Sequence, residues 1–160
     1  MNNAGVAPIS PLADLDTEGW STMIDVNLRG MLNGVAAALP VFRKQGSGHL
    51  ISIVSVAGLN GASPTMAVYA ATKNAVRTVH EGLRAESTDG VVRTTAISPG
   101  YIRTDLADSM ADQRIREQTR ERMDSMGIPP AAVARAAAFA VEQPGDVEIG
   151  EINVRPTVQA

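Results

Sequence analysis

The spacing of apolar side chains predicts helices that alternate with short buried strands. Apolar residues recur every three or four positions in Thr17–Phe42 and again in Met66–Ala85, which is typical of amphipathic helices. The runs His49–Val54 and Val91–Ile97 are short, β-branched and almost continuously apolar, the pattern of strands covered on both faces. We therefore expect two helix and strand pairs in the first two thirds of the chain.

The other segments extend this pattern. Residues 58–65 are rich in Gly, Asn, Ser and Pro and predict a loop, and Pro40 leaves little room for helix after it. Asp105–Asp124 is polar and helix-forming, so it is either an exposed helix or a mobile flap. A helix from Pro129 to Val141 and a strand at Glu148–Val154 complete the chain.

This order predicts an α/β fold with a parallel sheet and helices on its faces. We find no internal repeat and no linker, so residues 1–160 form one domain. Only three complete strands are present, with a stub near Asn2. The architecture is therefore expected to be a partial, doubly wound Rossmann-like sheet that lacks its N-terminal strands.

Composition removes several classes of protein. The 160 residues include no cysteine, which excludes a disulfide framework, a thiolate metal site and a Cys nucleophile. The net charge of −3 is a poor match to a dedicated nucleic-acid binder. The sequence shows no secretory leader and no apolar run of the ~18–20 residues needed to cross a bilayer. We expect a cytoplasmic protein with no membrane or nucleic-acid partner.

One pair of side chains suggests proton-transfer chemistry. Tyr69 and Lys73 are four residues apart, which places both on one face of the predicted helix. An ammonium group beside a phenol favours the ionised phenolate, so the pKa of the tyrosine is expected to fall toward neutrality. Taken alone, the pair is well explained as an ordinary contact on a helix surface, so the residues around it are needed to identify its role.

Those neighbours lie at the carboxyl ends of the predicted strands, where ligands bind in open parallel sheets. Ser55 follows the first strand and either contacts a substrate oxygen or caps the strand end. Asn27, inside the first helix, is either exposed by accident or kept for hydrogen bonding. The loop Ser98–Thr104 follows the next strand and is expected to close over the same edge.

Together these positions resemble the short-chain dehydrogenase/reductase family, in its short, single-domain form. Five segments carry the resemblance, in the right order and at suitable spacing: Asn2-Asn3-Ala4-Gly5, Asp25-Val26-Asn27-Leu28-Arg29-Gly30, Ser55-Val56-Ala57-Gly58, Tyr69-Ala70-Ala71-Thr72-Lys73 and Ser98-Pro99-Gly100-Tyr101-Ile102-Arg103-Thr104. The match extends over nearly the whole chain and corresponds to the C-terminal two thirds of the family's fold.

The resemblance implies an NAD- or NADP-dependent oxidoreductase that moves a hydride between the nicotinamide and a small alcohol or carbonyl substrate. Tyr69 would be the general acid/base, and Lys73 would lower the pKa of Tyr69 and bind the nicotinamide ribose. Ser55 would hold and polarise the substrate oxygen, and Asn27 would place a water that links Lys73 to solvent. These four residues are the predicted catalytic set.

The resemblance also implies cofactor contacts and an assembly. Besides Tyr69 and Lys73, the residues expected to contact the coenzyme are Asn3, Ala4, Gly5, Pro99, Gly100, Ile102 and Thr104. The polar segment after Asp105 resembles the family's substrate-binding flap. A homodimer or homotetramer is implied, with the helices of Thr17–Phe42 and Met66–Ala85 pairing between subunits.

The departure from the family lies at the front of the chain. No Gly-x-x-x-Gly-x-Gly or Gly-x-Gly-x-x-Gly turn occurs in the 160 residues, so the usual pyrophosphate site is not found and the choice between NAD and NADP cannot be predicted. A natural truncation, an engineered truncation or a start codon assigned too late would each explain this. The alternative hypothesis is an inactive fragment that acts at most as an interaction module.

Three further interpretations are weaker. A sugar-nucleotide epimerase shares the Tyr-x-x-x-Lys pair but needs a larger C-terminal region than the residues after Val154. A serine hydrolase is disfavoured because Ser55 lacks the Gly-x-Ser-x-Gly elbow. His49 and His80 have no partner ligands nearby in sequence, so we expect ordinary surface or strand-end residues and no metal site.

Overall fold

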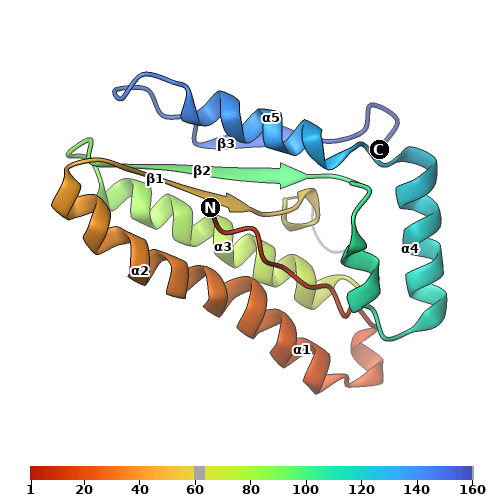
Figure 1. Cartoon of the computed structure of the whole chain (residues 1–160). Helices are drawn as coiled ribbons and strands as arrows, with labels where there is room; N and C mark the ends of the chain where they lie inside the picture. Colours follow the sequence, from red (N-terminus) through yellow and green to blue (C-terminus); the bar gives the residue numbers. More distant parts are fainter. Residues whose placement is uncertain (60–63, 160) are drawn as a thin grey trace.

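The computed structural model describes residues 1–59 and 64–159, so part of the predicted 58–65 loop lies outside the described residues (Figure 1). Its centre is a parallel sheet of β1 (Gly48–Ile53), β2 (Val92–Pro99) and β3 (Glu151–Val154), in that spatial order. The predicted α/β architecture is confirmed. The last strand begins three residues later than expected, because Glu148 accepts hydrogen bonds from Thr94 instead of joining a strand.

The predicted stub beside the first strand is also present. Asn2 forms a parallel bridge with Ser52, in which Asn2 N donates to Ile51 O at 2.7 Å and Ile53 N donates to Asn2 O at 2.9 Å. The segment after Asn2 therefore leaves the sheet at the carboxyl end of β1. This places residues 3–5 at the edge where the predicted site lies.

Helices cover both faces of the sheet (Figure 1). One face carries a long rod of α1 (Thr17–Met23), the π-helical segment Ile24–Arg29 and α2 (Gly30–Gln45), together with α3 (Ala67–Glu86). The opposite face carries α5 (Pro130–Val141), while α4 (Gln113–Met126) stands at the carboxyl ends of the strands. The short 3₁₀ segments are Leu12–Asp14, Val56–Gly58 and Asp105–Ser109.

The expectation that helix ends soon after Pro40 is wrong, because α2 continues to Gln45. Pro40 is exposed, so the carbonyl that lacks its usual N–H partner can bind water. The stop signal is instead Gly46, which adopts a φ of +77° and donates its N–H to Phe42 O at 2.9 Å. A left-handed glycine of this kind is a common helix C-terminus.

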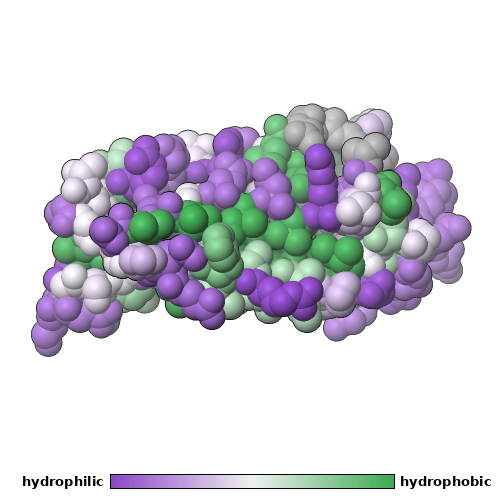
Figure 2. All heavy atoms as spheres, turned by 90° about the horizontal axis from the view of Figure 1, so that it is seen from above, coloured by the Kyte–Doolittle hydropathy of each residue, from purple (hydrophilic) through white to green (hydrophobic). Residues whose placement is uncertain are grey.

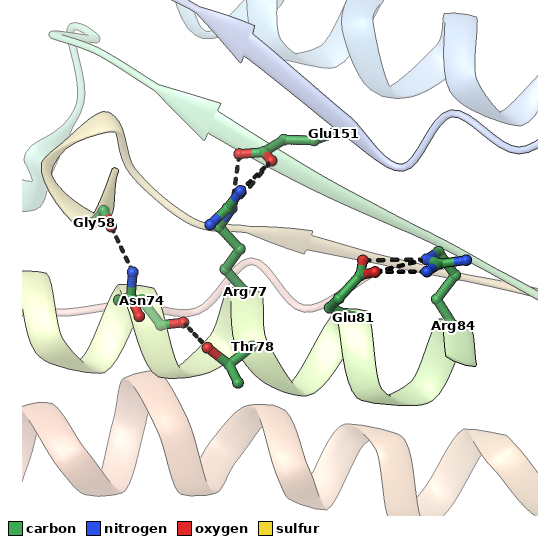
Figure 3. Close-up of polar contacts among 7 residues, drawn as sticks. All are labelled: Gly58, Asn74, Arg77, Thr78, Glu81, Arg84 and Glu151. Atoms are coloured by element: carbon green, nitrogen blue, oxygen red, sulfur yellow. Dashed lines mark hydrogen bonds and ion pairs between the residues drawn. The ribbon is translucent and has the colours of Figure 1, made fainter. Parts of the chain in front are cut away.

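Polar contacts tie α3 to its surroundings along its length (Figure 3). Asn74 Nδ2 donates to Gly58 O at 2.8 Å, which fixes the turn after Ser55. Arg77 Nε reaches both carboxylate oxygens of Glu151 on β3, at 3.1 and 3.0 Å. Glu81 and Arg84 pair within the helix. The helix that carries Tyr69 is thus anchored to two strand ends.

Candidate active site

Lys73 reaches from α3 to the end of β1. Its Nζ donates to Ile53 O at 3.0 Å, two residues before Ser55, and lies 5.8 Å from the centre of the Tyr69 ring. The residue is only 4% exposed, and burial lowers the pKa of Lys73 to about 8. The structure therefore brings the predicted Tyr69 and Lys73 pair to the strand end where Ser55 lies.

Tyr69 is buried among apolar side chains, and its pKa differs from the expectation. Burial raises the pKa of Tyr69 above 10, and a hydrogen bond with the Ser55 hydroxyl lowers it by less. The expected lowering by Lys73 is not found, because the Lys73 ammonium group hydrogen-bonds Ile53 O and not the phenol. At neutral pH Tyr69 therefore holds its proton.

Of the two roles considered for Ser55, the structure shows the cap. Ser55 precedes the 3₁₀ segment Val56–Gly58, and its Oγ accepts from Ala57 N at 3.2 Å. The same hydroxyl is near enough to the Tyr69 phenol to lower its pKa. The cap restricts the rotamer of Ser55 and so helps to keep its hydroxyl near the phenol.

Asn27 is buried, 3% exposed, in the π-helical segment. Its Oδ1 accepts from Val6 N at 2.9 Å, and its Nδ2 donates to Val6 O at 3.0 Å and to Thr72 Oγ1 at 3.2 Å. Both amide hydrogens are therefore used within the protein. Of the two interpretations of Asn27, the structure supports hydrogen bonding, and it shows the side chain fastening the N-terminal segment to α3.

Gly5 lies where even a Cβ atom would press against this network. A Cβ at Gly5 would come within 3.2 Å of Lys73 Nζ and 3.4 Å of Asn27 Oδ1. Asn3 and Ala4, the two residues before it, are exposed at the same edge of the sheet. The predicted Asn3–Gly5 contact segment therefore lies beside Lys73 and remains open to a ligand.

The β2 end supplies the remaining predicted residues. Pro99 is buried, whereas Gly100 packs against the C-terminal segment: a Cβ there would lie 2.1 Å from Gln159 Oε1 and 2.7 Å from Arg155 Cβ. Ile102 bridges Ile128, and exposed Thr104 caps the 3₁₀ segment Asp105–Ser109. Gly100 thus has a packing reason to be glycine that the sequence did not reveal.

The polar segment after Asp105 is helical and covers Tyr69. It forms the 3₁₀ segment Asp105–Ser109 and α4, whose buried side chains pack in one cluster with Tyr69. Of the two alternatives for Asp105–Asp124, the structure shows helix, in two pieces. Asp112 caps the second piece, its Oδ1 accepting from Ile115 N at 2.9 Å.

Two contacts near the candidate site were not predicted. The Thr72 hydroxyl donates to Tyr69 O at 2.8 Å and accepts from Asn27, so it connects the rod of α1 and α2 to the turn of α3 that carries Tyr69. His80 is not a surface residue: it is 3% exposed, and its Nε2 lies 2.7 Å from Ser52 Oγ. A Thr or His facing inward from an amphipathic helix is the signal that could have found them.

The residues at this edge fit the nicotinamide ribose end of NAD or NADP. Within residues 1–59 and 64–159, Ile53 O is the single acceptor that Lys73 Nζ contacts, which leaves donor capacity on a buried amine. Gly5 leaves the space beside that amine free of a side chain. The described part of the chain contains no cluster of His, Asp or Glu suited to a metal ion, and no helix there is long and apolar enough to span a membrane.

Comparison with known proteins agrees with this geometry. The family model described as short chain dehydrogenase matches residues 1–115. An uncharacterized oxidoreductase of Listeria monocytogenes is 45% identical over 159 residues, covering 98% of this chain and 64% of the relative. One of Staphylococcus saprophyticus is 41% identical, covering 100% of this chain and 65% of the relative.

Solved structures show the same relation. The closed form of serine dehydrogenase complexed with NADP⁺ superposes with a TM-score of 0.90 at 31% identity, covering 99% of this chain and 64% of that one. An alcohol dehydrogenase of the archaeon Thermococcus sibiricus, complexed with 5-hydroxy-NADP, gives a TM-score of 0.82 at 25% identity, covering 99% and 63%. The chain spans slightly less than two thirds of these proteins, and it belongs to the short chain dehydrogenase family.

Proposed function

We propose that this chain carries the catalytic part of an NAD- or NADP-dependent oxidoreductase that acts on a small alcohol or carbonyl compound. One observation carries the proposal. Lys73 and Tyr69 project from α3 to the end of β1, where the Ser55 hydroxyl is near enough to the Tyr69 phenol to lower its pKa. A phenol, a hydroxyl and a buried amine at one strand end form a proton-transfer site.

The roles of the side chains follow from these contacts. Tyr69, whose pKa is raised by burial, holds a proton on its phenol oxygen at neutral pH and would give it to the substrate oxygen during reduction. Ser55 would orient that oxygen by a second hydrogen bond. When bound, the nicotinamide would supply or accept the hydride. In the reverse direction Tyr69 would take the proton from the alcohol.

Lys73 and Asn27 would act around this pair. The buried amine of Lys73 has the donors to bind the ribose hydroxyls, and its positive charge would stabilise the phenolate once the proton has left Tyr69. Asn27 would hold Val6 and Thr72 in place. The lone pair left on its Oδ1 could accept from a water that links Lys73 to solvent. Asn3, Ala4, Gly5, Pro99, Gly100, Ile102 and Thr104 remain the proposed coenzyme contacts.

We also propose that the active form is a homodimer or homotetramer. A surface groove of about 430 Å³ runs between α3 and the rod of α1 and α2. Its lining is nearly all apolar: Leu12, Ile24, Leu28, Ala67, Val68, Ala71, Thr72 and Ala75. The same helices pair between subunits in the family that the sequence resembles, so a second copy is the proposed occupant.

The alternative hypothesis is an inactive fragment. It remains a candidate because the chain matches only part of the length of its relatives. The chain spans 64% of its Listeria relative. Activity is therefore to be measured both on the 160-residue chain and on a completed protein, in which the part of that relative outside the match is placed before Met1. Turnover by the completed protein alone would favour the fragment hypothesis for the shorter chain.

The experiment that tests Tyr69 is a Tyr69→Phe substitution in the completed protein. Phenylalanine keeps the ring that packs in the core and removes the proton. We expect turnover to fall by a factor of at least ~100–10,000 while the coenzyme dissociation constant changes little. Steady-state kinetics and fluorescence titration with NADH and NADPH provide the two values.

Tyr101→Phe is the matched control, because Tyr101 is the other tyrosine of the chain and its hydroxyl accepts from Arg122 on α4 at 3.1 Å. We expect this variant to keep turnover within a few-fold of the parent. Equal losses in both variants would remove Tyr69 from its assigned role.

A further inference from the structure

The side chains around Tyr69 bear on the class of substrate. Five buried apolar residues from three segments pack in one cluster with the tyrosine ring: Met23, Ala107, Met110, Ile115 and Met123. We call this set the methionine cover. Met23 belongs to α1, whereas Ile115 and Met123 belong to α4. Tyr69 is 6% exposed, so the cover and its neighbours leave little of this residue open to solvent.

Four arginines in or next to the segments that supply the cover have acceptors of their own. Arg116 on α4 donates to Met110 O at 2.8 Å, and Arg120 pairs with Asp108. Arg122 donates to the Tyr101 hydroxyl, and Arg103 donates to Gly127 O. Each of these guanidinium groups has a protein acceptor, and three of the four arginines are exposed at the surface. None of the four is held ready for a carboxylate beside Tyr69.

Two polar side chains that enter the same region, Ser109 and Asp112, are also hydrogen-bonded within the protein. Ser109 Oγ accepts from Ala7 N at 2.8 Å and donates to Leu106 O at 2.7 Å. Asp112 is used as the cap of α4. Burying an unpaired carboxylate here would be strongly unfavourable, because no compensating hydrogen bond or counter-charge is prepared among these groups.

We infer that the substrate of this site carries an uncharged, apolar substituent on its carbonyl or carbinol carbon, and that this substituent replaces the methionine cover when the segment Asp105–Met126 lifts. The inference rests on the proposed function of Tyr69. Methionine suits such a surface, because its unbranched side chain can repack around substituents of different shape. A hydroxy acid or an amino acid carries a charged carboxylate and does not meet this requirement.

The test is ligand binding to the 160-residue chain labelled with ¹³C at its methionine methyl groups. The probes are 2-heptanone and 6-oxoheptanoate, which differ in that a carboxylate replaces the terminal methyl group. We expect 2-heptanone to shift the methyl signals of Met23, Met110 and Met123. The carboxylate should bind at least about tenfold more weakly.

Met31 is the matched control, because it is equally buried, at 4% exposure, but packs in a separate core cluster with Val54 and Val76. Its methyl signal should not move. Signals are assigned by methionine to leucine substitutions, which nearly conserve volume. Binding of the carboxylate as tight as that of the ketone, absence of shifts at the cover, or equal shifts at Met31 would each overturn the inference.

The outcome is separable from that of the proposed function. Preferential turnover of 6-oxoheptanoate over 2-heptanone by the completed protein would refute the apolar substituent and leave the oxidoreductase intact. Ketone binding at the cover with no hydride transfer to any carbonyl compound would support the binding surface and refute the function on which the inference rests.

Discussion

At the scale of single residues, the account depends on what burial does to titratable groups. Burial raises the pKa of Tyr69 and lowers that of Lys73 to about 8, so both groups favour their neutral forms more than they would in water. A neutral phenol beside an amine that is partly deprotonated near pH 8 is a responsive pair: a bound substrate or coenzyme changes the charge balance and can move a proton.

Burial also shifts the pKa of His80, and this shift makes the stability of the fold depend on pH. Burial holds the pKa of His80 at about 4, below its ordinary 6.5, while the smaller influences are Glu148, which raises this pKa, and His49, which lowers it further. The unfolded chain therefore binds more protons between these two values, so stability is fully present above pH 6.5 and is lost as the pH falls through 4. We expect this group to remove up to about 3 kcal/mol of unfolding free energy across that window.

Urea unfolding at several pH values between 4 and 7 measures this loss. His80→Gln, which keeps a polar contact to Ser52 without a titrating ring, should flatten the dependence. His49→Gln should flatten it less, because burial also lowers the pKa of His49 but that ring is only half-buried, near the start of β1, where it hydrogen-bonds Thr95. A His80→Gln variant with the parent's pH dependence would show that another group is responsible.

Residue identities were more predictable than residue contacts. The sequence pointed to Tyr69, Lys73 and Ser55 through their spacing and strand-end positions, and the structure brings them to one place. It could not show that the Asn27 amide hydrogen-bonds Val6 and Thr72, because these two residues are 21 and 45 positions away from Asn27 in the sequence. Such contacts are set by packing of the whole fold and not by local pattern.

At the scale of elements, hydrophobic periodicity predicted most segments well and failed where backbone geometry departs from the regular helix. The first predicted helix is continuous in extent but includes the π-helical segment Ile24–Arg29. Periodicity at three and four residues does not distinguish such a widened turn, which often occurs at functional sites. Here it holds Asn27 at the buried side of the rod.

Pro40 gives the element-scale prediction. Because α2 continues past it, Pro40 leaves one interior carbonyl without its N–H partner, and Pro40→Ala would restore that bond. We expect the unfolding free energy to rise by about 1–2 kcal/mol, the helix gain being partly offset by the more flexible unfolded chain. Denaturant unfolding provides the value.

Ala37→Gly, at another exposed position of α2, is the opposite control and should cost about 0.5–1 kcal/mol. If Pro40→Ala destabilised the chain, the ring of Pro40 would have to make a favourable contact that the exposed position does not suggest.

At the scale of the whole molecule, the fold exposes apolar surface in two places. Figure 2, which looks onto the side of the sheet that carries α5, shows a band of apolar atoms across that face, and Phe139 of α5 is 53% exposed. The groove beside α3 lies on the other side. Apolar areas of this kind mark surfaces that associate with other polypeptide.

The groove gives the prediction for assembly. Ala71→Glu places a charge in the apolar lining, so we expect the dimers and tetramers of the completed protein to dissociate toward monomer. Sedimentation velocity measures the masses. Val41→Glu, an exposed apolar position of α2 outside the groove lining, is the control and should leave the mass unchanged. Dissociation by the control alone would place the interface elsewhere.

The central claim is that a hydride moves between nicotinamide and substrate at this edge of the sheet while Tyr69 gives or takes the proton. Isotope tracing tests this claim most directly. NADH and NADPH deuterated at the nicotinamide C4 are mixed with a ketone and the completed protein, and the alcohol is analysed by mass spectrometry. We predict one deuterium on the carbinol carbon from at least one coenzyme, and a loss of this product in Tyr69→Phe. Undiminished deuterium transfer in Tyr69→Phe, or none from a parent that binds the coenzyme, would contradict the account.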